Sequence, residues 1–168
     1  MKILVFSDSH GRSQEMREAV AKHARNTDAV FFLGDGYLNF VRIRDEFPAI
    51  AFYGVLGNCD LAGLFRGEEV FYERIVSLDS YRFLLMHGHK YWVKEGYGRA
   101  VEHAKAAGAD VLLCGHTHCP LDTTDDGLIL FNPGSVGEYT NGRRTYGILE
   151  IVNGVLVRSH ADLSGDKI

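Results

Sequence analysis

Short clusters of aspartate, histidine and asparagine recur along this sequence, and these residue types supply the nitrogen and oxygen donors that transition metals bind. Five of the eight histidines lie in such clusters. An isolated histidine carries little information, whereas repeated donor clusters indicate a metal site. The clusters are Asp8-Ser9-His10, Gly34-Asp35-Gly36, Gly57-Asn58-Cys59-Asp60, His87-Gly88-His89 and Gly115-His116-Thr117-His118.

Each cluster directly follows a run of apolar, β-branched or aromatic residues, which is typical of a buried β-strand. In α/β sheets the carboxyl ends of parallel strands share an edge, and ligands bind in the crevice outside it. We therefore expect the clusters to meet there, joined by Asn132-Pro133-Gly134-Ser135. The strands expected before the clusters span residues 2–6, 29–33, 50–56, 82–86, 110–114 and 128–131.

The remaining pattern predicts the fold class. Helical patterns alternate with strands in the first half, which predicts parallel strands with right-handed crossovers, and turn sequences in the last third predict antiparallel strands. We expect an α/β fold with a mixed sheet or two packed mixed sheets flanked by helices, in a single domain over residues 1–168. The expected helices span 13–26, 37–47 and 97–107, and the expected antiparallel pairs join 70–78 to 82–86 and 145–152 to 155–160.

Composition excludes several classes of partner. The chain has 18 Lys and Arg against 22 Asp and Glu, so its net charge of −4 gives no overall basic field for extended DNA or RNA. No apolar run approaches the roughly 20 residues that span a bilayer, and the start does not have the pattern of a secretory signal. The three cysteines contain no Cys-x-x-Cys pair. We expect a cytoplasmic protein with reduced thiols.

Each cluster by itself has an ordinary structural interpretation. Asp8 and Asp35 fit turn carboxylates, Asn58 a loop amide, and His87 or His116 a buried histidine with a hydrogen-bond partner. Unrelated turns have no reason to place these residue types after successive strands in this order. The joint pattern therefore favours one shared site.

The order Asp-x-His, Gly-Asp, Gly-Asn-x-Asp, His-Gly and Gly-His-Thr-His resembles the calcineurin-like metallophosphoesterase superfamily. The short length, Gly-Asn-Cys-Asp and Asn-Pro-Gly-Ser make the chain similar to its small single-domain prokaryotic phosphodiesterase branch. The resemblance covers residues 1 to about 157. It implies a four-layer sandwich of two packed mixed sheets flanked by helices, with a two-metal site at the carboxyl ends of the strands.

The resemblance also implies which residues hold metal. The first ion would be bound by Asp8, His10, Asp35 and His118. The second would be bound by Asp35, Asn58, His87 and His116, with Asp35 as the bridge between ions about 3.5–4 Å apart. Two divalent ions against two carboxylates leave a positive site that attracts anions. The mixed donor set predicts two divalent transition-metal ions, manganese first, with nickel, zinc, iron or cobalt as alternatives.

The function implied is hydrolysis of a small phosphodiester by in-line attack of metal-bound hydroxide, with a water pKa lowered toward about 7. Asp35, Asn58 and His116 are the expected catalytic residues, acting with that hydroxide. The alternatives are a phosphomonoesterase, a nuclease, or a scaffold that binds protein partners, as a retromer subunit of this fold does. The expected partner is a small phosphoester substrate, and neither extended nucleic acid nor a membrane is expected. The sequence does not decide whether the protein is a monomer or a homo-oligomer.

The sequence departs from the family pattern in two places. Many relatives carry histidine where this chain has Cys59, so the sequence does not assign the group that protonates the leaving group. Cys59 is either a small packing residue beside Asn58 or a residue that contacts the substrate. Asp60, without that histidine, is expected to cap the following turn. No arginine follows Asp35 as it does in phosphatase relatives, which favours monoanionic diesters over dianionic monoesters. Asn132 and Ser135 are expected as weaker substrate contacts, and Leu61, Leu64 and Phe65 as core, a substrate rim or a subunit interface.

Overall fold

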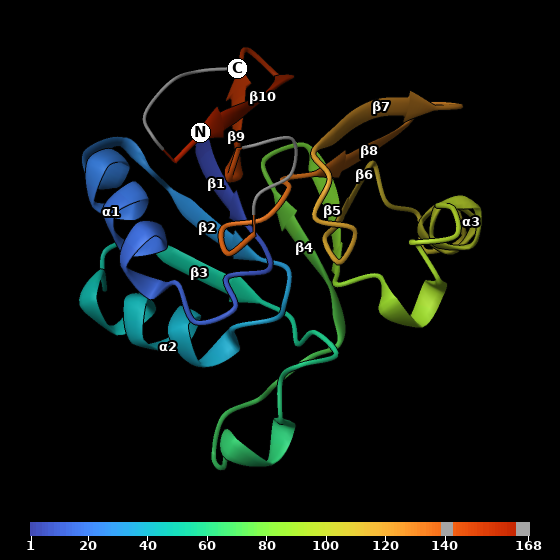
Figure 1. Cartoon of the computed structure of the whole chain (residues 1–168). Helices are drawn as coiled ribbons and strands as arrows, with labels where there is room; N and C mark the ends of the chain where they lie inside the picture. The colour runs from blue at the N-terminus through green and yellow to red at the C-terminus, as the bar shows by residue number, and fades with distance from the viewer. Residues whose placement is uncertain (139–142, 164–168) are drawn as a thin grey trace.

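The structure, a computed structural model, describes residues 1–138 and 143–163. Its strands form two five-stranded sheets that pack face to face, with helices on the outer faces (Figure 1). Within these residues, no helix combines the length and apolar character needed to span a membrane.

The first sheet has the order β10-β9-β1-β2-β3. Its three parallel strands come from the first third of the chain, and its two antiparallel strands come from the end. The sheet is therefore mixed, as predicted. Its strands are β1 (Lys2–Phe6), β2 (Ala29–Phe32), β3 (Ala51–Gly54), β9 (Thr145–Val152) and β10 (Val155–Asp162).

The second sheet has the order β4-β5-β6-β8-β7, with β5, β6 and β8 parallel and the two edge strands antiparallel. Strand β7 was absent from the sequence prediction, because its residues Leu-Asp-Thr-Thr-Asp are mostly exposed and give no apolar alternation. The strands are β4 (Glu73–Leu78), β5 (Tyr81–Met86), β6 (Val111–Cys114), β7 (Leu121–Asp125) and β8 (Leu128–Asn132).

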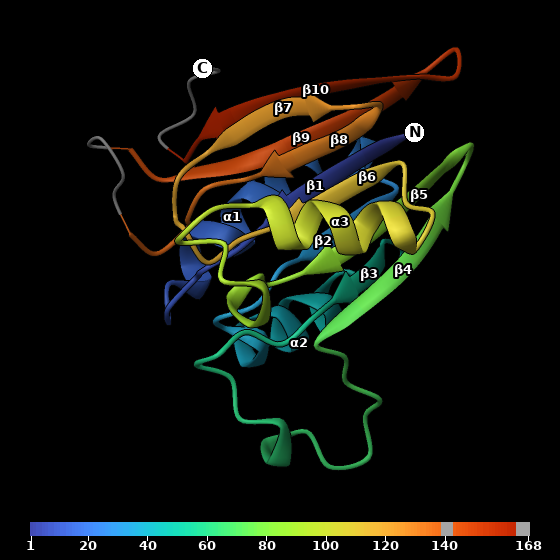
Figure 2. The same cartoon turned by 90° about the vertical axis from the view of Figure 1, so that its right-hand side faces the viewer.

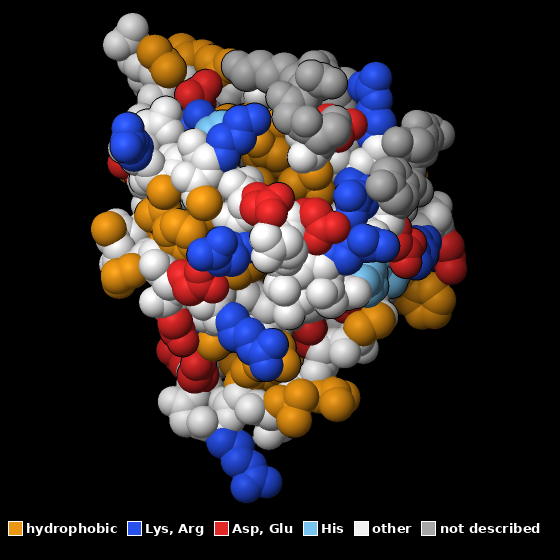
Figure 3. Space-filling model, turned by 60° about the vertical axis from the view of Figure 1, so that its left-hand side comes forward, with side chains coloured by type: hydrophobic (Ala, Val, Ile, Leu, Met, Phe, Trp, Pro, Cys, Tyr) orange, Lys and Arg blue, Asp and Glu red, His pale blue; other side chains and the backbone are white. Residues whose placement is uncertain are grey.

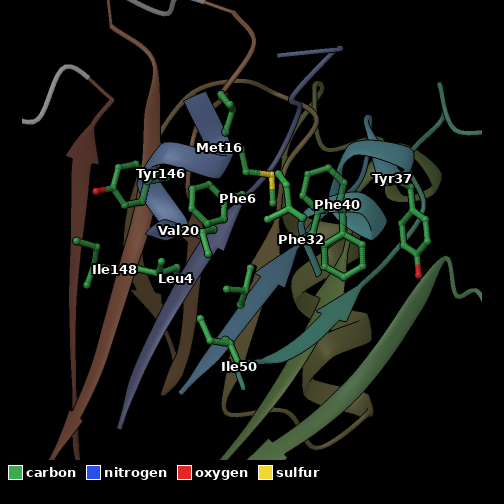
Figure 4. Packing of buried hydrophobic residues seen from close by; sticks show 14 of the residues in the cluster. Leu4, Phe6, Met16, Val20, Phe32, Tyr37, Phe40, Ile50, Tyr146 and Ile148 are labelled. Carbon is green, nitrogen blue, oxygen red and sulfur yellow. The ribbon is translucent and has the colours of Figure 1, made fainter. Parts of the chain in front are cut away.

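Alternation along the strands builds the layers. In β1, Ile3 and Val5 pack between the two sheets, whereas Leu4 and Phe6 point to the helices of the first sheet. All four side chains are fully buried, and each burial of this kind contributes about 1.5–3 kcal/mol to folding. Figure 4 shows Phe6 between Met16 and Val20 of helix α1 and Leu4 beside Ile148 of β9, all in one cluster.

The helices cover the outer faces, which completes the four layers expected from the resemblance. Helices α1 (Ser13–His23) and α2 (Tyr37–Glu46) pack on the first sheet, and α3 (Gly98–Ala106) packs on the second, against β6 and β8 (Figure 2). The described part of the chain also has short 3₁₀ turns, which are η1 (Ala24–Asn26), η2 (Ala62–Leu64) and η3 (His89–Tyr91).

Candidate metal centre

The donor clusters follow strands β1, β2 and β3 of the first sheet and β5 and β6 of the second. Backbone hydrogen bonds connect these loops: Asp8 N–H donates to Gly34 O at 2.9 Å, and Gly115 N–H donates to His87 O at 3.1 Å. Because both sheets present their carboxyl ends on the same side, loops far apart in the sequence meet there. The structure brings all of the predicted histidine and aspartate ligands into one cluster.

Asp8 has one carboxylate oxygen that points into this cluster. Its Oδ2 accepts hydrogen bonds from Ser7 Oγ at 2.5 Å and from the backbone N–H of His116 at 3.1 Å. Its Oδ1 is buried and has no hydrogen-bond partner among the described residues. That oxygen lies 3.1 Å from His118 Nε2 and 3.8 Å from His10 Nε2. A buried anionic oxygen without a donor, beside two ring nitrogens, fits a cation ligand.

His87 presents a defined ring nitrogen to the cluster. Its Nδ1 lies 2.7 Å from the carbonyl oxygen of Leu33, so Nδ1 carries the proton and donates it. Its Nε2 therefore faces Asp35 Oδ2 at 3.4 Å and His116 Nδ1 at 3.1 Å. A backbone carbonyl that fixes the tautomer in this way is the usual support of a metal-binding histidine.

The pKa values of the metal-free cluster reflect the same geometry. Burial tends to lower the pKa of His87, but its hydrogen bond to Asp35 and the charges of Asp8 and Asp35 outweigh burial and raise that pKa. Burial tends to raise the pKa of Asp35, yet His87 holds it well below its usual range. Burial and the neighbouring His87 lower the pKa of His116 to about 4. His116 is therefore neutral near pH 7, with a lone pair free for a metal.

Asp35 belongs to two overlapping donor groups. One contains Asp8 and His87, and the other contains His10 and Cys59, with the ligand atoms of each group within 4.8 Å of one another. A hydrogen bond holds the Asp35 carboxylate in place, because its Oδ1 accepts the backbone N–H of Cys59 at 2.8 Å. Asp35 is therefore the residue that these two donor groups share.

Five of the candidate ligands adopt a backbone conformation that is rare for residues other than glycine. A positive φ at such a residue costs of order 1–3 kcal/mol and concentrates at functional sites. The strain allows each loop to turn sharply after its strand, and it was not visible in the sequence. The residues are Asp8, His10, Asp35, His116 and His118, with φ between 44° and 65°.

Glycine at position 57 is required by a close approach. A Cβ atom built there would lie 2.1 Å from Asp35 Oδ1, well inside contact distance. Any larger residue would displace the Asp35 carboxylate. The Gly-Asn sequence after β3 therefore leaves space for the central ligand.

Asp60 ties two ligand loops together. Its carboxylate accepts four backbone N–H groups, from Asp35, Gly36, Tyr37 and Gly57, at 2.8–2.9 Å. Two of these donors open helix α2, where a negative charge is favourable. The prediction that Asp60 caps the following turn is wrong, because its oxygens reach back to the helix that precedes it.

Asn58 and Cys59 lie at the exposed rim of the cluster. Asn58 Nδ2 lies 3.2 Å from Cys59 Sγ, and both residues are exposed. Burial, followed by the hydrogen bond and charge of Asp35, raises the pKa of Cys59 to about 11 in the metal-free protein. The thiol is protonated there. Its position in a donor group with His10 and Asp35 was not anticipated from the sequence.

Asn132 and Ser135, expected as substrate contacts, are buried and bonded to protein. Asn132 Nδ2 donates to Gly115 O and Thr117 Oγ1 at 3.0 Å, and Ser135 Oγ donates to Asp8 O at 3.0 Å. With exposed fractions of 0% and 1%, these two side chains hold ligand loops in place rather than face solvent.

Sequence reasoning missed Glu138, which lies 2.8 Å from His118 Nδ1. A carboxylate at that nitrogen leaves Nε2 of the ring facing Asp8. Glu138 follows the Asn-Pro-Gly-Ser sequence by three residues, and no pattern in the sequence pairs it with His118.

Comparison with known proteins shows the family of this chain. The model of the calcineurin-like phosphoesterase superfamily domain matches residues 1–154, so the chain belongs to that family. A probable metallophosphoesterase, YsnB of Bacillus subtilis, is 32% identical over 100% of this chain and 95% of its own length. The phosphodiesterase MJ0936 of Methanocaldococcus jannaschii is 29% identical over 89% of this chain and 93% of its own length.

Solved structures share the fold. A predicted phosphoesterase from Streptococcus pneumoniae superposes with a TM-score of 0.83 at 24% identity, covering 99% of this chain and 92% of that one. The phosphoesterase Yfce of E. coli gives 0.72 at 27% identity, covering 100% and 97%. Vps29 from Entamoeba histolytica, solved with Zn²⁺, gives 0.73 at 19% identity, covering 97% and 99%, and this likeness concerns the fold alone.

Proposed function

We propose that this protein is a dimetal-dependent phosphodiesterase that hydrolyses a small phosphodiester. The observation that carries the proposal is Asp8 Oδ1, a buried carboxylate oxygen without a hydrogen-bond donor, which faces ring nitrogens of three histidines within 3.9 Å. Such an oxygen is costly to bury unless a cation compensates it. Family membership and the name of the MJ0936 relative support the phosphodiester reaction.

The residues fit two cations. Asp8, His10, Asp35 and His118 would hold one, and Asp35, Asn58, His87 and His116 would hold the other, with Asp35 shared. We propose manganese as the resident ion, with nickel, zinc, iron and cobalt as alternatives, because nitrogen and oxygen donors are mixed.

When bound, the two cations supply the Lewis acidity that activates water and neutralises phosphoryl charge. The chain's own residues orient the reaction. Asp35, held by the Cys59 N–H and by His87, fixes the spacing of the two donor groups. His116, neutral because of its low pKa, offers a lone pair rather than a proton, and Asn58 at the exposed rim would offer a neutral amide oxygen.

The charges around the cluster favour diesters over monoesters. Within the described residues, the ion-pair partners of Asp8 and Asp35 are histidines, and no arginine or lysine joins them. A dianionic monoester gains most from a guanidinium clamp, whereas a monoanionic diester needs less positive charge. The net charge of −4 similarly disfavours a nuclease that tracks a long polyanion.

The test is a substrate panel of phosphomonoesters, cyclic and linear diesters and short oligonucleotides, each with manganese, nickel and zinc. We expect hydrolysis of aryl diesters such as bis(4-nitrophenyl) phosphate, and a loss of at least 100-fold in kcat/KM with Asp35→Asn. Protein that binds metal but hydrolyses no phosphoester would instead support the scaffold role suggested by the Vps29 fold. We also propose that the protein is located in the cytoplasm.

A further inference from the structure

A cavity opens beside the metal centre, between the start of helix α2 and the turn η2. Its volume is about 250 Å³. Its lining includes the apolar residues Leu38, Leu61, Leu64 and Phe65 and the polar residues Asn39, Cys59 and Asp60. We call this cavity the leucine pocket.

The leucines of this pocket are unusually exposed. Leu61 and Leu64 are 67% and 65% exposed, and Leu38 is 44% exposed. Single exposed leucines are common, but three around one cavity form an apolar surface that water covers at a cost. Figure 3, which shows the side of the molecule carrying α1 and α2, has hydrophobic side chains at the lower end of this face, beneath a histidine.

The turn that presents these leucines is anchored. Phe65 is 8% exposed, and its ring packs edge-on against Tyr37 with centroids 4.9 Å apart. Leu64 N–H and Phe65 N–H close the 3₁₀ turn on Leu61 O and Ala62 O at 3.0 and 3.1 Å. The segment between β3 and β4 projects below the sheets in Figures 1 and 2. The anchoring therefore holds Leu61 and Leu64 outward from a fixed base.

The pocket is continuous with the metal centre through Cys59. This residue lines the pocket, and its Sγ shares a donor group with Asp35 and His10. A phosphoryl group at the cluster would therefore lie next to the pocket, on the side of Cys59.

The lining chemistry defines the occupant. Among the described residues, neither lysine nor arginine lines the pocket, so a second phosphate has no cationic partner there. Asp60 turns its carboxylate to four backbone N–H groups of the protein instead of toward a ligand. A volume of about 250 Å³ exceeds the roughly 150 Å³ that holds benzene but falls below the range for drug-sized ligands.

We propose that the leucine pocket binds one uncharged, apolar ester arm of the substrate, of the size of a single aromatic ring or a short branched alkyl chain. The proposal rests on the proposed function, since it places the phosphoryl group at the metal centre. It makes Leu38, Leu61 and Leu64 determinants of specificity rather than of the chemical step.

The experiment compares two diesters that share a leaving group, phenyl 4-nitrophenyl phosphate and methyl 4-nitrophenyl phosphate, with rates divided by those of the uncatalysed reactions. The wild-type protein should favour the phenyl arm by about 10-fold or more in kcat/KM, because the free energy gained by partly burying an aromatic ring corresponds to a preference of that size. Leu61→Ser and Leu64→Ser should each reduce this ratio toward 1 and leave the methyl substrate within about 2-fold. Val157→Ser, an exposed position of 51% on β10, is the matched control and should leave the ratio unchanged.

A second readout does not depend on turnover. Diphenyl phosphate added to the zinc-loaded protein should shift the amide NMR signals of Leu61 and Leu64, and dimethyl phosphate should not. Shifts without hydrolysis of any diester would support the pocket and overturn the proposed function. Hydrolysis with equal use of both arms, and without shifts, would overturn the pocket and leave the function intact. A dimer in light scattering that Leu64→Ser separates, with the phenyl preference unchanged, would make the surface a contact between two copies and also overturn the proposal.

Discussion

The backbone N–H of Asp35 donates to Oδ2 of Asp60 at 2.8 Å, across 25 residues of sequence. Asp60 lies in the loop after β3, and this bond fixes the backbone of Asp35, the central carboxylate of the cluster, in the loop after β2. The same Asp60 carboxylate accepts three further N–H groups, so one side chain sets the relative position of two loops. Asp60 contributes to the metal centre without facing it.

We expect Asp60→Asn to lower the free energy of unfolding by about 1.5–3 kcal/mol, because an amide replaces a charged acceptor of four N–H groups. Metal affinity should fall as well, since Asp35 loses its support. Urea unfolding and zinc titration measure the two effects. Asp110→Asn is the control, because Asp110 accepts one such bond, from Arg82 N–H at 2.8 Å, before strand β6 begins. Equal effects of the two substitutions would contradict the role given to Asp60.

Metal loading should stabilise the protein. A ligand at 100 times its dissociation constant adds about 2.7 kcal/mol, which for a chain of this length raises Tm by about 5–10 °C. The shift should appear with manganese, zinc or nickel and reverse with a chelator, and scanning fluorimetry measures it. Asp8→Asn removes the buried carboxylate charge that faces His10, His87 and His118, and it should remove the shift. An unchanged Tm in wild-type protein at saturating ion would argue against a metal centre.

Glu138→Gln should weaken metal binding by about 10-fold, because the carboxylate at His118 Nδ1 aligns that ring. The free energy of unfolding should change by less than about 0.5 kcal/mol, since Glu138 is 59% exposed. Isothermal titration with zinc gives the affinity. Glu46→Gln, which breaks the exposed ion pair with Arg17, should leave the affinity unchanged. A Glu138→Gln protein that binds zinc as tightly as Glu46→Gln would remove Glu138 from the site.

Cys59→Ala should retain activity within about 3-fold on diesters with good leaving groups, because such groups depart without a proton donor. The raised pKa of the thiol in the metal-free protein agrees with a neutral side chain at this position. Steady-state kinetics with bis(4-nitrophenyl) phosphate provide the measurement. A loss as large as that of Asp35→Asn would reassign Cys59 as a proton donor or as a metal ligand beside His10.

The sequence by itself determined the strands that carry the site and the order of the donors. Strand β1 was predicted at its observed bounds, and β2, β6 and β8 within one residue at an end, because buried strands are written as continuous apolar runs. Donor residues beside glycine follow directly after those runs. This pattern indicated a metal site from the sequence alone, without any knowledge of contacts between the loops. The family pattern supplied the four layers, and the structure confirms them.

Only the tertiary structure decided which groups support those donors. Glu138 lies 20 residues from His118 and Leu33 lies 54 residues from His87, and these pairings depend on how loops from separate strands meet. The leucine pocket forms in the same way, because Leu38 and Leu64 line one cavity only after α2 and η2 pack through Tyr37 and Phe65. Local sequence fixes residue type and spacing along the chain, whereas distances between loops follow from the packing of the two sheets and their helices.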